Sequence, residues 1–302
     1  MRRAWMRTAA VLLFVAAAAL LSFPAGQRAV RGYRDGLEIR TFEENKSQET
    51  DADVCLRESM EEYNRRIFTQ GQSGLSDAWG YEKGAFNFEG TGLDDEMIGY
   101  ISIPAMDIRL PLYIGASEEN LMKGAAVLAQ TSMPLGGEDT NCVIAGHRGG
   151  YFGQAVFRDI EVLRAGDTVE ITNLWETLEY EVVKCIVISP DDLDAVKIRP
   201  GRDMVTLVTC HPYTHNYQRY VVYCSRSGQD KTQDNRGEEA ASLPYGLPYE
   251  PSGDAVRRED MLTAVGLIVL GAAAVFGVAE IYRRRKGRRK SWKKTGKTGK
   301  RI

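Results

Sequence analysis

The chain has 302 residues and is nearly neutral, with 39 Lys and Arg against 41 Asp and Glu, but its charges are segregated. The tail 283–302 holds twelve Lys or Arg and no acid, whereas the stretch 27–260 holds 24 basic and 40 acidic residues, a net charge of −16. We therefore do not expect nucleic-acid binding, because the concentrated basic charge lies in the tail and the stretch 27–260, which is expected to fold, is acidic. A hydrophobic content of 43% excludes disorder throughout the chain.

The first apolar run, 8–26, contains no charge and is preceded by three arginines. Its length suits either a spanning helix or the core of a signal peptide, and small residues near its end leave cleavage open. We favour a retained anchor over 1–26. The arginines before it then place the N-terminus in the cytoplasm by the positive-inside rule.

The second apolar run, 261–282, is the stronger membrane candidate. As a helix it would rise about 33 Å, which is enough to cross the hydrocarbon core. The basic tail 283–302 follows at once and is expected in the cytoplasm, where it can also contact anionic membrane lipid. Both termini are then cytoplasmic and 27–260 is extracellular, with its polar end 227–260 as a linker to the membrane.

Residues 51–68 are predicted to form an amphipathic helix. Apolar residues recur there at helical spacing, namely Leu56, Met60, Tyr63 and Ile67. The stretch 70–92 that follows is rich in Gly and contains several aromatic residues. We expect it to be a loop that packs on the domain through those aromatic side chains.

Residues 97–226 alternate between β-rich runs and turns. The runs are 98–103, 108–113, 142–145, 169–171, 178–182, 204–209 and 220–224. Short helices are expected at 117–122, with Ser117 as N-cap, and at 157–163. Seven or eight short strands with only short helices between them predict a closed or nearly closed β-barrel.

The five cysteines are an odd number, and their spacing is not that of a disulfide scaffold. Cys55, Cys142, Cys185 and Cys224 are each expected to be small buried residues. Cys210 differs from them, because it ends a run of Val, Thr and Leu. A thiol in that position is held at the end of a strand, where it can be aimed at a substrate.

Cys210, His147 and Arg219 each lie at the end or the start of a predicted strand. If those strands are neighbours, the three side chains meet at one rim of the barrel. Thiol acyl transfer needs such a trio, because a cation favours the thiolate, an imidazole moves protons and a guanidinium stabilises an oxyanion. The residues alone leave an alternative open, in which a buried cysteine lies near unrelated surface charges.

A zinc site is the rival interpretation for His211 and His215. They are spaced i, i+4 and lie beside Cys210, as zinc ligands often do. Pro212 interrupts the segment, and no acid or further cysteine lies close in sequence. We therefore expect two polar loop residues near the rim, and neither a metal nor a cofactor.

Several motifs between about 97 and 226 resemble, in order, those of the sortases, the cysteine transpeptidases of Gram-positive bacterial surfaces. The signature around the nucleophile is matched by Thr206-Leu207-Val208-Thr209-Cys210, Pro212-Tyr213 and Arg219, and the histidine turn by Ala145-Gly146-His147-Arg148-Gly149. Further segments are similar to class C, the pilin-polymerising subfamily, namely Leu110-Pro111-Leu112-Tyr113, Pro190-Asp191-Asp192-Leu193 and Ile198-Arg199-Pro200-Gly201. Two membrane segments around the catalytic domain are also typical of that subfamily.

The resemblance implies an eight-stranded sortase-type barrel at 94–226 with its site in a groove. It implies that Cys210 is the acyl-accepting nucleophile, His147 the general acid and base, and Arg219 the oxyanion stabiliser. The substrate would be a secreted protein with an LPXTG-like sorting signal, cut after the Thr. A pilin lysine would then accept the acyl group during pilus assembly. Anchoring of surface proteins to the cell wall, hydrolysis, and a non-enzymatic membrane-tethered binding module are the alternatives.

Class C sortases often carry a lid with an Asp-Pro-aromatic motif upstream of the barrel, and the region 27–93 holds Asp77-Ala78-Trp79. The resemblance implies that Asp77 faces Arg219 and that Trp79 lies near Cys210. Ala78 replaces the usual proline, which leaves the backbone less restricted. The alternative is a structural loop in which the tryptophan simply packs.

Overall fold

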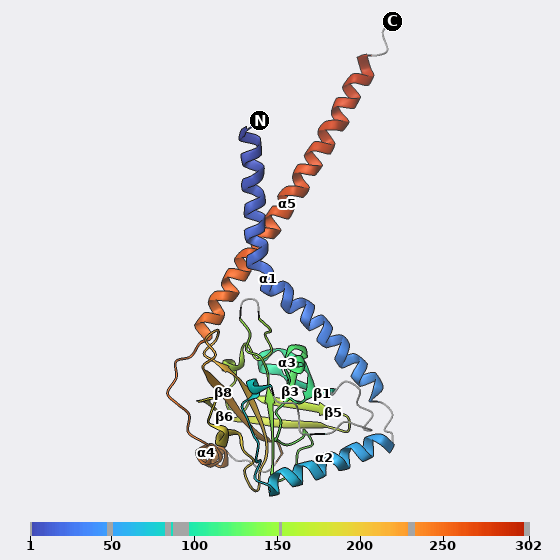
Figure 1. Ribbon diagram of the computed structural model, residues 1–302. Helices are drawn as coiled ribbons and strands as arrows, with labels where there is room; N and C mark the ends of the chain where they lie inside the picture. The colour runs from blue at the N-terminus through green and yellow to red at the C-terminus, as the bar shows by residue number, and fades with distance from the viewer. Residues whose placement is uncertain are drawn as a thin grey trace. The chain divides into compact units, whose positions relative to one another are not determined.

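The computed structural model describes residues 2–46, 51–81, 86, 97–150, 153–228 and 233–298 (Figure 1). The chain divides into two units. One unit contains 1–28 and 257–302, and the other contains 29–256. The second unit holds the whole β-barrel and is the one that positions the candidate site.

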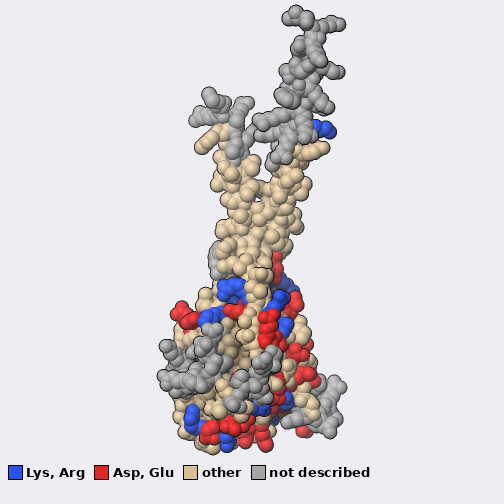
Figure 2. Space-filling model, turned by 90° about the vertical axis from the view of Figure 1, so that its right-hand side faces the viewer, with Lys and Arg blue, Asp and Glu red and all other residues tan. Residues whose placement is uncertain are grey.

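Two helices are long and apolar enough to cross a membrane, over Ala9–Asn45 and Gly253–Ala279. They belong to α1 (Arg2–Asn45) and α5 (Gly253–Thr298), which extend past the predicted runs because a helix need not end where its apolar sequence ends. The predicted boundary between 26 and 27 therefore falls inside α1. Figure 2 shows a mostly uncharged surface along the described parts of these helices, while acidic and basic side chains lie scattered among uncharged ones on the barrel unit.

The barrel is closed, with the strand order β1-β2-β3-β4-β7-β8-β6-β5. Its strands are β1 (Met97–Ile103), β2 (Ile108–Ile114), β3 (Ala125–Val127), β4 (Thr140–Ala145), β5 (Thr168–Asn173), β6 (Thr177–Ile188), β7 (Asp203–His211) and β8 (Gln218–Arg226). The predicted closed barrel of eight strands is confirmed. Strand β3 was missed, because three small apolar residues are too few to show alternation.

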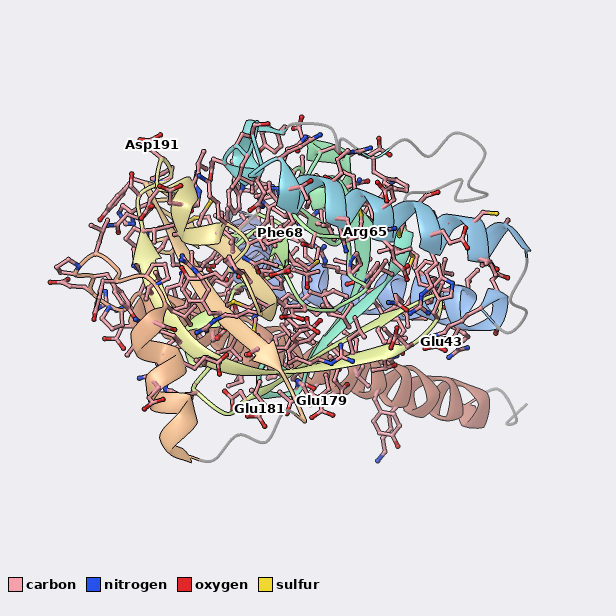
Figure 3. All side chains as sticks on the ribbon, turned by 90° about the horizontal axis from the view of Figure 1, so that it is seen from below. Glu43, Arg65, Phe68, Glu179, Glu181 and Asp191 are labelled. Atoms are coloured by element: carbon pink, nitrogen blue, oxygen red, sulfur yellow. The ribbon has the colours of Figure 1, made fainter. Side chains whose placement is uncertain are left out.

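Successive side chains on the central strands separate two apolar clusters. On β7, Val205 and Leu207 belong to the barrel interior, whereas Met204 and Val208 belong to a second cluster on the other face. The interior cluster also includes the apolar face of α2 (Asp51–Thr69), whose Leu56, Met60, Tyr63 and Ile67 are all buried. This helix crosses one end of the barrel, as Figure 3 shows from below with its Arg65 and Phe68 labelled.

Short helices complete the unit. Helix α3 (Glu118–Lys123) begins as predicted, with the Ser117 hydroxyl accepting a 3.2 Å hydrogen bond from the Asn120 N–H. The helix predicted at 157–163 is reduced to the 3-10 turn η3 (Ile160–Val162). The other 3-10 turns are η1 (Ala78–Gly80), η2 (Pro104–Met106) and η4 (Leu193–Val196).

Of the predicted linker 227–260, the structure describes 227–228 and 233–260. The linker contains helix α4 (Gln233–Ser242). After α4, residues 243–252 form an irregular segment, here called the strap, that lies alongside β6. The Lys184 ammonium donates to the carbonyl of Leu243 at 3.2 Å, and the Leu247 N–H donates to the carbonyl of Val187 at 2.7 Å. The strap fits there because β5 pairs with only the first part of β6, which leaves the edge of the second part free.

The cysteine predictions hold only in part. Cys142 and Cys224 are buried, and Cys185 is half-buried. Cys55 is exposed, so the prediction that it is buried was wrong. It lies on α2 next to Leu56, and one helical position turns a side chain by about 100° away from the buried face.

Replacing Gly99 by alanine is expected to destabilise the barrel. An added Cβ would lie 1.9 Å from the backbone oxygen of Thr172 on the paired strand β5. A backbone atom cannot move aside cheaply, so we expect a loss of about 3 kcal/mol in the free energy of unfolding, the upper end for overpacking. Urea unfolding checks it. Gly237→Ala on α4 is the control, since its added Cβ meets nothing within 4 Å apart from the adjacent backbone of its own helix. A loss for Gly99→Ala no greater than for this control would contradict the prediction.

Candidate active site

The strand register aligns Cys210, His147 and Arg219 in one row across three neighbouring strands. Strands β4 and β7 run parallel with Ala145 opposite Val208, so the residues two positions further on, His147 and Cys210, fall at the same level. Strands β7 and β8 are antiparallel with Cys210 directly opposite Arg219. Side chains at paired positions share a face, about 5 Å apart at Cβ.

The turn that carries His147 is attached to β7 by hydrogen bonds. The Thr209 hydroxyl donates to the carbonyl of Gly146 at 2.6 Å, and the Gly146 N–H donates to the carbonyl of Val208 at 3.2 Å. These bonds lie next to both Cys210 and His147 in sequence. These two hydrogen bonds therefore fix the segment of His147 against the segment of Cys210.

Asp77 holds the Arg219 guanidinium in a two-point ion pair. Arg219 Nε donates to Asp77 Oδ1 at 2.8 Å, and Nη2 donates to Oδ2 at 2.7 Å. Arg219 also donates from Nη1 to the carbonyls of Asn216 and Gln218, at 3.1 and 2.9 Å. The predicted pairing of Asp77 with Arg219 is thus present in the structure.

Trp79 lies between Arg219 and His147. Its ring faces the guanidinium, with Arg219 Cζ 4.6 Å from the ring centroid. Its Nε1 donates to His147 Nδ1 at 3.4 Å. Asp77 and Trp79 therefore contact two of the three aligned residues, and Cys210, beside them, is only 7% exposed.

The Sortase domain family model matches residues 101–227. Sortase C of Streptococcus pneumoniae, in a structure described for catalysis and pilin substrate specificity, is 32% identical with a TM-score of 0.52. That match covers 63% of this chain and 96% of the other. Sortase C1 of GBS pilus island 1 is 31% identical with a TM-score of 0.58, covering 66% and 95% of the two chains. The chain belongs to the sortase family.

A curated relative is similar over the catalytic region. Sortase A of Bacillus anthracis is 34% identical over 127 residues, which are 42% of this sortase and 58% of that protein. The chain thus spans well under two thirds of that relative's length.

Charges and burial keep the thiol and the imidazole of this sortase neutral. Burial raises the pKa of Cys210 to about 11, with Asp77 acting in the same direction and Arg219 and Arg148 opposing it. Burial also lowers the pKa of His147, the positive charge of Arg31 lowers it further, and Glu118 opposes both. At neutral pH the covered site therefore holds a thiol and a neutral imidazole. A thiolate beside an imidazolium would be the more nucleophilic form.

The structure places His211 and His215 in different surroundings. His211 is completely buried at the end of β7, so the expectation of a polar loop residue was wrong for it. His215 is exposed. No group of three or more His, Cys, Asp or Glu suited to a metal ion occurs among the described residues. Burial of His211 could not be predicted locally, because its partner Glu161 is fifty positions away in the sequence.

Arg31, on the part of α1 that belongs to the barrel unit, contacts Gln154 and Lys123. The Arg31 guanidinium donates to the Gln154 side chain and, at 3.1 Å, to the carbonyl of Lys123. Arg31 was not among the residues that the sequence singled out, because its partners are about 90 and 120 positions away. Its charge is thereby fixed close enough to disfavour protonation of His147.

Replacing Arg31 by alanine is expected to raise the pKa of His147, because one of the two causes that lower it is removed. The imidazolium, the form able to donate a proton, then persists to higher pH. NMR titration of the imidazole signals in the full-length protein measures this, with assignment helped by the presence of only three histidines. Exposed Arg34 gives the control Arg34→Ala, and an unchanged or lowered His147 pKa in Arg31→Ala would contradict the prediction.

Proposed function

We propose that this chain is a membrane-anchored class C-like sortase that joins secreted proteins to an amine, with Cys210 as nucleophile, His147 as general acid and base, and Arg219 as oxyanion stabiliser. The observation that carries the proposal is the row of these three residues across β4, β7 and β8. A thiol, an imidazole and a guanidinium at one level supply the three functions that thiol acyl transfer requires.

In the acylation step, the Cys210 thiol gives its proton to neutral His147, and the resulting thiolate attacks the carbonyl carbon of the Thr in an LPXTG-like sorting signal. The carbonyl oxygen becomes an oxyanion beside the Arg219 guanidinium. Protonated His147 then gives its proton to the nitrogen of the departing Gly, and the Thr–Gly bond breaks. The products are a thioester on Cys210 and a free amine on the released peptide.

In the second step, an acceptor amine attacks the thioester carbonyl. Neutral His147 takes a proton from that amine, the new amide bond forms, and Cys210 leaves as a thiolate. We propose a pilin lysine as the acceptor, so that the product is a covalent pilus. Two similar structures support this choice, because one is of a sortase C described for its pilin substrate specificity and the other is of a sortase C1 from a pilus island.

We further propose that Asp77 and Trp79 are a lid that must leave before substrate binds. This proposal is supported by the ion pair of Asp77 with Arg219 and by the contact of Trp79 with His147. Displacing the lid exposes the thiol to water and removes the Asp77 charge, and both changes lower the pKa of Cys210 from its covered value. Substrate access and thiolate formation are then coupled to the same movement.

The two apolar helices support a location at the cell membrane. We propose that both termini are cytoplasmic and that the barrel lies outside, where sorting-signal proteins and pilins are the partners. The basic residues of the tail favour this orientation by the positive-inside rule.

Acceptor analysis tests the proposed function against its alternatives. The full-length protein is incubated with a sorting-signal substrate, a pilin-type protein and a cell-wall peptide, and the joined product is sequenced by mass spectrometry. A link to a pilin lysine supports pilus assembly, and a link to the wall peptide would make the enzyme an anchoring sortase. Release of the free acid alone would indicate a hydrolase, and no cleavage at all would favour a binding module.

A further inference from the structure

The residues directly after the proposed catalytic pair point away from it. His211 follows Cys210 on β7, where successive side chains face opposite sides. Arg148 follows His147, and while His147 contacts Trp79, Arg148 contacts Glu161. Both are buried, with Arg148 1% and His211 0% exposed. A guanidinium removed from water in this way needs a charged partner.

Glu161, in the 3-10 turn η3, is that partner. Arg148 Nη2 donates to Glu161 Oε1 at 2.8 Å, and His211 Nδ1 lies 3.2 Å from the same oxygen. Arg148 Nη1 also donates to the carbonyl of Cys210 at 3.4 Å. The guanidinium thus connects the carboxylate with the backbone of the nucleophile, on the side opposite the lid.

Glu161 stays ionised throughout the useful pH range. Burial opposes its charge, but hydrogen bonds from His211, Ser252 and Arg148 outweigh burial and lower the pKa of Glu161 to about 2. Its folded pKa lies below the ordinary value, so the stability that it contributes is lost only as pH falls toward 2. Glu161 is therefore charged at neutral pH in the cluster with Arg148 and His211.

Ser252, directly before α5, closes the same cluster. Its N–H donates to Glu161 Oε2 at 2.9 Å, and its hydroxyl donates to Oε1 at 2.6 Å. The hydroxyl also accepts a 3.1 Å hydrogen bond from the N–H of Tyr213, three residues after Cys210. A residue of the C-terminal segment is thus built into the support of the β7 end.

The first turn of α5 is fixed by a second arginine. Arg158 Nη2 donates to the carbonyl of Val256 at 3.1 Å, and its Nε donates to the Tyr213 hydroxyl at 3.4 Å. The carbonyl of Arg158 accepts from Arg148 Nε at 3.3 Å, which joins the two arginines. Ser252 and Val256 therefore contact the segments next to Cys210 and His147 through the side chains of Glu161 and Arg158.

We propose that Glu161 is a positioning residue for the catalytic pair, and that Ser252 at the start of the C-terminal anchor helix completes its hydrogen bonding. The inference rests on the proposed function, because it concerns the geometry of Cys210 and His147. Glu161 fixes Arg148, and Arg148 fixes the turn after His147 and the carbonyl of Cys210. The segment that leads into the membrane is consequently part of the active-site scaffold.

Steady-state kinetics of full-length variants in detergent micelles tests this role, with an LPXTG peptide and an amine acceptor. For Glu161→Gln we expect kcat to fall about 10–100-fold with KM changed less than about twofold, because misplacement of reacting groups acts on the chemical step. Ser252→Ala should show a smaller fall in kcat, and Ser252→Thr, which keeps the hydroxyl, should retain the parental kcat. Glu176→Gln is the matched control, since Glu176 pairs with Arg57 outside this cluster.

Thermal unfolding of each variant separates positioning from loss of structure. If Glu161→Gln and Ser252→Ala both keep the parental kcat, the inference is overturned. It is also overturned if their loss of kcat disappears when the assay is run well below each variant's Tm. If Glu161→Gln does not fold, the pair Ser252→Ala and Ser252→Thr decides.

The Cys210→Ala variant distinguishes failure of this inference from failure of the proposed function. Parental activity in Cys210→Ala would overturn the proposed function itself. An inactive Cys210→Ala beside fully active Glu161→Gln and Ser252→Ala would overturn the positioning role alone.

Discussion

Replacing Cys210 by alanine is expected to abolish cleavage and transfer of a sorting-signal substrate, with a fall in kcat of at least about a thousandfold. The sulfur is the atom that would carry the acyl group, and neither His147 nor Arg219 can replace it. The barrel should remain folded, because the change removes one atom from a small side chain at the end of β7. Transfer to an amine acceptor, followed by mass spectrometry, measures the effect.

Cys55 provides the matched control for that variant. It is an exposed thiol on α2, outside the aligned row. Cys55→Ala should keep the parental kcat and KM. Parental activity in Cys210→Ala, or an equal loss in both variants, would contradict the role of Cys210.

Replacing Trp79 by alanine, or Asp77 by alanine, is expected to raise the alkylation rate of Cys210 at pH 7 about 10–100-fold. With its pKa at about 11, only about one thiol in ten thousand is ionised at pH 7 in the covered site. Loss of Trp79 admits water, and loss of Asp77 removes a charge that raises this pKa. In both variants the rise of alkylation rate with pH should therefore have its midpoint below that of the parent.

The measurement uses iodoacetamide between pH 6 and 10, in a Cys55→Ala background so that the exposed thiol does not compete. Peptide mass spectrometry then reports the modification of Cys210 alone. Trp79→Phe and Asp77→Asn are the matched variants, because the first keeps the packing without the N–H to His147 and the second keeps the shape without the charge. Equal or slower alkylation in both alanine variants would show that these residues do not cover the thiol.

Sequence periodicity predicted the barrel well because side chains on successive positions of several strands face different surroundings. Run 178–182 alternates interior apolar residues with glutamates, and run 204–209 places Val205 and Leu207 in one apolar cluster and Met204 and Val208 in the other. This alternation is visible without a structure. The amphipathic helix at 51–68 was clear for the same reason, since all its predicted apolar positions are buried. Strand β3 has no such signal and owes its place to pairing with β2 and β4.

The aligned row could be anticipated from strand ends, but its surroundings could not. Cys210, His147 and Arg219 are identified by their positions next to β-rich runs, and the register then brings them to one level. The contacts of Arg148 with Glu161 and Ser252 join positions 13 and 104 residues apart, and no local pattern encodes them. The same holds for the strap on β6, whose polar composition suggested a linker although its backbone bonds to a free strand edge.

Isolation of a covalent intermediate tests the central claim most directly. The full-length protein is mixed with an LPXTG peptide without an acceptor, quenched in acid, digested and examined by mass spectrometry. We predict that the peptide containing Cys210 gains the mass of the LPXT acyl group, and that an added amine removes this adduct. Absence of the adduct on Cys210 under conditions where the peptide is cleaved, or its appearance on another cysteine, would contradict the proposed mechanism.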